Sequence, residues 1–186
     1  MADPQVKGAL LLPYQKLILE NKELNWHEYL KEEDWPIING KILNVWYPFS
    51  TFERCGLATF NLLAKKNLKA VKVWAKQTAN EIFNNYKMVI EADNPISGIT
   101  NLFGIRAVLF NFNLFEVAIE KIDAKHIKTT LTTTLPHKQG VEPFTWQVIG
   151  WLEFIIEKTG GKNPSIEIVA KQWLFEPNTI LAIKWD

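Results

Sequence analysis

The sequence predicts an α+β fold, with a helical N-terminal half, about residues 1–112, followed by a four-stranded antiparallel sheet, about residues 113–186. Two alternating runs predict the first half of the sheet. Residues 115–120 and 126–133 alternate apolar and polar positions, which is typical of half-buried strands. Only a short polar turn separates the two runs, so we expect them to form a hairpin.

One helix and two further strands complete the predicted sheet half. Pro143 opens a stretch with helical spacing of apolar residues, and the stretch ends at two consecutive glycines. Two more alternating runs, 165–173 and 179–185, follow and are joined by Glu-Pro-Asn. The order strand, strand, helix, strand, strand therefore predicts an antiparallel sheet that one helix crosses.

Apolar residues at helical spacing predict the helices of the N-terminal half. The predicted helices span residues 6–21, 50–66, 69–91 and 96–111. Pro13 lies within the first and predicts either a kink or a late start. Ser50 and Glu53 have the spacing of a capping box at the start of the second. Residues 41–46 are expected to be extended. The segment 96–111 is apolar on nearly every side, so we expect a buried central helix.

Composition favours one soluble globular domain over residues 1–186, without a nucleic-acid partner. Hydrophobic residues make up 47% of the chain and charged residues 22%, and the net charge of +1 carries no signal for nucleic acid. The only cysteine, Cys55, fits a reducing compartment. No window resembles a signal peptide or a membrane span, so we expect a cytoplasmic protein. Eight tryptophans and eleven phenylalanines suit either a lined ligand cavity or a densely packed core.

No catalytic motif or metal motif is present in the sequence. The three histidines, His27, His126 and His137, are scattered and lack metal-ligand spacing. The acidic run 32–34 is expected to be a solvated loop. Lysines at 65, 69, 72 and 76 fall on one helix face, which is expected to be solvated as well. An enzyme is therefore the least favoured class of function.

Short motifs across nearly the whole chain resemble one superfamily. It joins haem–nitric oxide sensor domains, vinyl-reductase-like ligand-binding domains and the small TRAPP vesicle-tethering subunits. Residues 143–161 resemble the helix of that superfamily with an internal glycine and a following glycine, and residues 179–185 resemble its terminal strand. Val6-Lys7-Gly8, Trp46-Tyr47-Pro48 and the final Trp185 are similar to an uncharacterised bacterial subgroup common in myxobacteria.

This resemblance implies an apolar ligand held between the helical half and the sheet, and it argues against haem. The haem sensors suspend iron from a histidine on the helix before the sheet, and here the segment 96–111 has none. Their Tyr-x-Ser-x-Arg motif for the haem propionates is also missing. We therefore expect no cofactor. Some TRAPP subunits attach an acyl chain to a cysteine in a region comparable to that of Cys55, although a buried structural thiol is the preferred interpretation.

Two functions of different classes follow. The first is a non-enzymatic sensor or carrier that binds an apolar small molecule. Its expected lining is Phe103, Val108, Trp151 and Ile155, with Cys55 as a further candidate. The second is a TRAPP-like protein-interaction module, a homodimer or a partner-binding subunit, whose cavity is filled by side chains. Gly150, inside the last helix, predicts a close approach of backbone to the sheet, a ligand or a partner.

Overall fold

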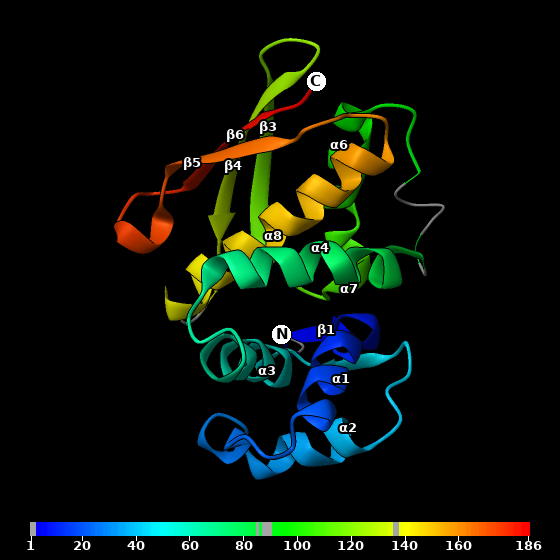
Figure 1. The fold of residues 1–186 in the computed structure, drawn as a ribbon, viewed down its shortest axis with the longest axis vertical. Helices are drawn as coiled ribbons and strands as arrows, with labels where there is room; N and C mark the ends of the chain where they lie inside the picture. Colours follow the sequence, from blue (N-terminus) through cyan, green and yellow to red (C-terminus); the bar gives the residue numbers. More distant parts are fainter. Residues whose placement is uncertain (1–2, 85, 87–90, 136–137) are drawn as a thin grey trace. The chain divides into compact units, whose positions relative to one another are not determined.

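The computed structural model describes residues 3–84, 86, 91–135 and 138–186. It consists of two compact units. The N-terminal unit comprises Met1–Val71 with Ala107–Phe112, and the sheet unit comprises Lys72–Arg106 with Asn113–Asp186. The α+β order predicted from the sequence is confirmed, since helices precede a four-stranded antiparallel sheet (Figure 1).

Short strands and helices build the N-terminal unit. In chain order they are β1 (Gln5–Lys7), η1 (Gly8–Leu10), α1 (Leu12–Glu20), η2 (Trp26–Glu28), η3 (Glu32–Asp34), α2 (Trp35–Asn39), β2 (Trp46–Pro48) and α3 (Phe49–Leu62). β1 pairs with β2 in antiparallel register, with Val6 opposite Tyr47. Phe110 bridges to Val6, which ties the segment 107–112 to this unit.

The first predicted helix begins later than its apolar pattern suggests. The apolar pattern extends back to residue 6, but α1 begins at Leu12, with Pro13 in its first turn, which is the late start that Pro13 predicted as an alternative to a kink. Proline fits there because its missing N–H would have no partner in a first turn. The preceding residues pair as β1 instead. Of the segment 41–46, which was expected to be extended, only Trp46 lies in a strand, because β2 starts there and Asn44 and Val45 form a bend.

Helix α3 corrects two further expectations. It starts at Phe49 after Pro48, without a side-chain cap, so the predicted capping box at Ser50 is not formed. It ends at Leu62, before two left-handed residues, Lys65 and Lys66 (φ 49° and 62°), which a continuing helix cannot include.

The sheet unit contains the remaining elements. They are most of α4 (Leu68–Asn84), α6 (Pro95–Gly104), β3 (Phe115–Lys121), β4 (His126–Thr133), α8 (Lys138–Lys158), β5 (Ser165–Ala170), η4 (Gln172–Leu174) and β6 (Thr179–Lys184). The strand order is β3-β4-β6-β5, all antiparallel, so both predicted hairpins are confirmed. One sheet face is apolar and buried, with Ile127, Leu131, Leu181 and Ile183 in its centre.

Two helices of the sheet unit differ from their predicted bounds. α8 starts at Lys138, and Pro143 lies inside it rather than at its start. The predicted central helix 96–111 is broken at Ile105 into α6 and α7 (Arg106–Leu109). Asn94 caps α6, because its Oδ1 accepts from the amide of Ser97 at 3.0 Å. The tail of the predicted helix 69–91 includes positions 85 and 87–90, which lie outside the described residues.

Candidate functional site

Aromatic rings from three elements of the sheet unit meet in its interior. Phe103 of α6 packs edge-on against Phe115 of β3, with ring centroids 6.2 Å apart. Phe115 in turn contacts Phe144 of α8 at 5.8 Å. All three side chains are buried. They link the helix predicted to be central, the edge of the sheet and the crossing helix in one apolar cluster.

Trp151 of α8 is buried on another part of the same helix. It is 5% exposed, and its ring is edge-on to Phe83 of α4 at 5.9 Å. Its indole Nε1 has no hydrogen-bond partner. On the inner sheet face, the Oγ1 of Thr129, a residue 0% exposed, also lacks one. A buried donor without an acceptor costs about 1–3 kcal/mol, so a hydrogen-bond partner at either atom would be stabilising.

Gly150 lets α4 and α8 approach closely within the sheet unit (Figure 1). A Cβ at Gly150 would lie 2.3 Å from the carbonyl oxygen of Lys72 and 2.8 Å from the Cβ of Ala75. The close approach expected for this glycine therefore exists, and its partner is helix α4.

Ion pairs border the same crossing of α4 and α8. Lys72 Nζ lies 2.8 Å from Glu153 Oε1, and Lys76 Nζ lies 2.7 Å from Glu157 Oε1. The expectation of a fully solvated lysine face on α4 was thus wrong for these two lysines. The periodicity of one helix cannot show which charges a second helix will bring to it.

The residues predicted to line a ligand site fall in both units. Phe103, Trp151 and Ile155 belong to the sheet unit, where Ile155 is 1% exposed and packs on Gly98 of α6. Val108 and Cys55 belong to the N-terminal unit. Val108 is 40% exposed, which does not match the buried lining expected of it.

Cys55 lies in the apolar core of the N-terminal unit, beside residues such as Ile18 and Trp26. Its side chain is buried. Burial, reinforced by the nearby carboxylate of Asp34, raises the pKa of the thiol to about 12. Since the thiolate is the reactive form, this cysteine has the environment of a structural thiol rather than of an attachment point.

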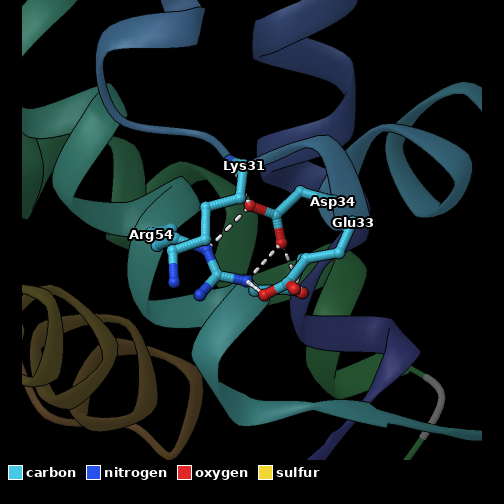
Figure 2. A network of polar contacts seen from close by, with 5 residues as sticks. Lys31, Glu33, Asp34 and Arg54 are labelled. Carbon is cyan, nitrogen blue, oxygen red and sulfur yellow. Dashed lines mark hydrogen bonds and ion pairs between the residues drawn. The ribbon is translucent and has the colours of Figure 1, made fainter.

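A buried carboxylate, Asp34, organises the polar part of the N-terminal unit (Figure 2). It is 0% exposed and receives a bidentate contact from Arg54, whose Nε and Nη2 each lie 2.7 Å from a carboxylate oxygen. The hydroxyl of Thr51 donates at 2.7 Å, and the amide of Lys31 at 2.8 Å. Glu33 completes the group, 2.7 Å from Arg54. The predicted solvated acidic loop was therefore wrong at Asp34.

These contacts decide the charge of Asp34. Burial alone would raise its pKa, but the hydrogen bonds from Arg54, Thr51 and Lys31, together with the Arg54 charge, outweigh it and hold the pKa below its ordinary value. The hydrogen bonds to Asp34 raise the pKa of Arg54. Arg54 was the residue in the sequence that could have indicated this buried ion pair. It lies next to Cys55 and one turn from Thr51, on the buried side of α3. A cation there requires a carboxylate partner.

The described histidines do not gather into a site. His27 is exposed, and its ring lies 4.7 Å from that of Trp35. His126 begins β4, in register with Lys184 of β6. His137 lies outside the described residues. Among the residues that the structure describes, no group of three His, Cys, Asp or Glu side chains could hold a metal ion. No described helix is long and apolar enough to cross a bilayer.

Comparison with known proteins identifies the fold. No family model and no curated protein matches the sequence. Solved structures do match. An H-NOX protein from S. oneidensis in the Fe(II)NO ligation state has a TM-score of 0.69 at 9% identity, over 97% of this chain and 99% of that one. The Fe(II) unliganded H-NOX protein from K. algicida has a TM-score of 0.66 at 12% identity, over 97% and 96%.

A third neighbour extends the same result. It is an oxygen-binding H-NOX domain related to soluble guanylate cyclases, with a TM-score of 0.62 at 10% identity, over 97% of this chain and 95% of that one. All three matches cover nearly the whole of both chains. They agree with the resemblance seen in the sequence, and the chain therefore has an H-NOX-like fold.

Proposed function

We propose that this chain is a non-enzymatic sensor or carrier domain that binds an apolar small molecule inside its sheet unit. The observation that carries the proposal is the indole Nε1 of Trp151, which is buried among apolar side chains without an acceptor. A ligand that is largely apolar and has one hydrogen-bond acceptor would satisfy this donor. Phe83, Phe103 and Ile155 would supply apolar contacts from three helices of the same unit.

The described histidines do not lie where the resemblance expects a histidine to hold haem. The segment 96–111, which forms α6 and α7, contains no histidine. Of the described histidines, His27 lies in the N-terminal unit against Trp35, and His126 lies at the start of a strand. The H-NOX structures from S. oneidensis and K. algicida are in Fe(II) states, whereas the proposed ligand of this chain is held by packing and one hydrogen bond.

Native mass spectrometry of protein purified without organic solvent tests the proposal. We expect a non-covalent adduct that leaves on denaturation. Trp151→Phe keeps an aromatic ring but removes the indole N–H together with the five-membered ring, so it should lower the affinity for the ligand by at least roughly tenfold, the value of one buried hydrogen bond. Trp146→Phe, a half-buried tryptophan of the same helix, is the control and should leave occupancy unchanged.

Two outcomes would overturn the proposal. The absence of any adduct in the unmodified protein would favour a filled interior and an interaction module. An adduct equally occupied in the Trp151→Phe and Trp146→Phe variants would place the ligand away from the indole of Trp151.

A further inference from the structure

Two segments of the N-terminal unit combine positive charge with exposed apolar side chains. Residues 4–19 and 35–52 contain three lysines, Lys7, Lys16 and Lys41, and no acidic residue. Three large apolar side chains are exposed in the second segment, Leu43 at 51%, Val45 at 49% and Trp46 at 38%. We call these six residues the lysine–tryptophan surface. The net charge of the whole chain, +1, conceals this local excess.

Contacts within the unit bring the two segments together. The strands β1 and β2 place Lys7 opposite Trp46, and the Lys7 ammonium lies 4.1 Å from the centre of an indole ring. The amide of Gly8 donates to the carbonyl of Val45 at 3.0 Å. A Cβ at Gly8 would lie 2.0 Å from the Leu43 carbonyl oxygen, so only glycine permits this approach. The backbone at Leu43 and Val45 is therefore held against Gly8, next to Lys7.

Helix α1 holds the start of the loop 40–45, which connects α2 to β2. The Nε2 of Gln15 donates to the carbonyl oxygens of Ile38 and Gly40, at 2.7 Å each. Lys41 follows Gly40, and Lys16 follows Gln15, so both lysines flank these hydrogen bonds. Leu12, which is 43% exposed, lies one helical turn before Lys16 and adds another apolar side chain.

We propose that the lysine–tryptophan surface binds the headgroup region of an anionic lipid bilayer. Tryptophan and aliphatic side chains insert at the boundary between headgroups and acyl chains, and lysine ammonium groups stay at the level of anionic headgroups. The Lys7 ammonium held over the Trp46 indole keeps a positive charge next to the ring that inserts. The mode is peripheral, since it needs a surface and no membrane-spanning helix.

The composition favours a lipid over an acidic protein partner. Protein interfaces are enriched in arginine and depleted in lysine, because guanidinium groups recognise fixed carboxylates with two hydrogen bonds. Here all three cations are lysines, and they come from a strand, a helix and a loop. Such dispersed point charges suit an array of headgroups that can rearrange around them.

Co-sedimentation of the full-length chain with vesicles tests this inference. We expect binding to phosphatidylcholine vesicles that contain phosphatidylserine, little binding to phosphatidylcholine alone, and weakening by salt. Replacing Lys7, Lys16 and Lys41 by Gln should lower the partition coefficient by roughly fivefold per lysine. Replacing Leu43 and Val45 by Ser should also lower it, by about tenfold, with the charge unchanged.

Matched substitutions in the sheet unit control for total charge and hydrophobicity. Lys121, Lys125 and Lys162, all exposed, are replaced by Gln to remove the same charge, and Leu174 and Val169, 60% and 59% exposed, are replaced by Ser. These variants should bind as the unmodified protein does. Equal losses in both sets, or no binding to phosphatidylserine vesicles, would overturn the inference. Self-association without vesicle binding, abolished by the lysine substitutions, would instead assign the surface to a second copy.

Discussion

Asp34 keeps a negative charge inside the N-terminal unit because Arg54, Thr51 and the Lys31 amide compensate for its burial. Its pKa lies below the ordinary value of 3.8 in the folded state. The stability that this difference supplies is fully present above the unfolded-state pKa and is lost as pH falls through the folded-state pKa. The paired carboxylate is therefore one source of acid sensitivity in this protein.

We predict that Asp34→Asn lowers the free energy of unfolding by roughly 3 kcal/mol at neutral pH, because the largely buried Arg54 then keeps only the exposed carboxylate of Glu33 as a partner. The variant should also show a shallower loss of stability below about pH 4 than the unmodified protein. Urea unfolding at a series of pH values measures both effects. An equally steep loss of the free energy of unfolding below about pH 4 in the two proteins would contradict this account of the Asp34–Arg54 pair.

Cys55 should be unreactive while the protein is folded, since burial raises its pKa to about 12. We predict that a thiol reagent such as iodoacetamide labels it very slowly at pH 8 in buffer and rapidly in urea. The rate of labelling followed by mass spectrometry checks this. Rapid labelling of the native protein would restore the reading of Cys55 as an attachment point.

Trp151→Ala distinguishes a solid interior from a lined cavity. A fully packed tryptophan should cost about 3–5 kcal/mol of stability on truncation, because the deletion leaves a void. With a ligand beside the indole, we predict a clearly smaller cost in ligand-free protein, since part of the space is already present. Urea unfolding of protein first freed of its adduct measures the difference. A loss of 3–5 kcal/mol in that material would indicate a filled interior.

The crossing of α4 and α8 depends on the missing side chain at Gly150. We predict that Gly150→Ala destabilises the protein by about 1–3 kcal/mol, because its Cβ would overlap the backbone of α4 at Lys72. Gly104→Ala is the control, since it lies in α6 with no atom within 4 Å of the added Cβ. Thermal unfolding compares the two. An equally tolerated Gly150→Ala would mean that the helices are not in close contact.

Elements differed in how well the sequence could predict them. The strands β3, β4 and β6 were predicted nearly to the residue, because alternation along a strand reports directly which face is buried. Helix starts were harder. The late start that Pro13 predicted as one alternative is confirmed, since Pro13 lies in the first turn of α1, whereas Pro143, expected to open a helix, lies inside α8. Tertiary packing determines the residue at which such a helix begins, and the local sequence pattern carries no information about that packing.

At the scale of the whole molecule, the fold could be predicted and the contacts between elements could not. An H-NOX-like fold persists here at 9–12% identity to its structural neighbours, because the order and periodicity of elements survive extensive substitution. The Asp34–Arg54 pair and the Gly150 crossing each join residues far apart in the sequence. A single sequence indicates that such a residue needs a partner, but not which partner it finds.

The central claim is that this H-NOX-like chain holds an apolar molecule in place of haem. The absorbance spectrum of protein purified from haem-supplied cells tests it most directly. We predict a colourless protein without a Soret band, because α6 and α7 offer no histidine. A Soret band that disappears in His126→Ala or His27→Ala would contradict the claim and assign haem to this chain.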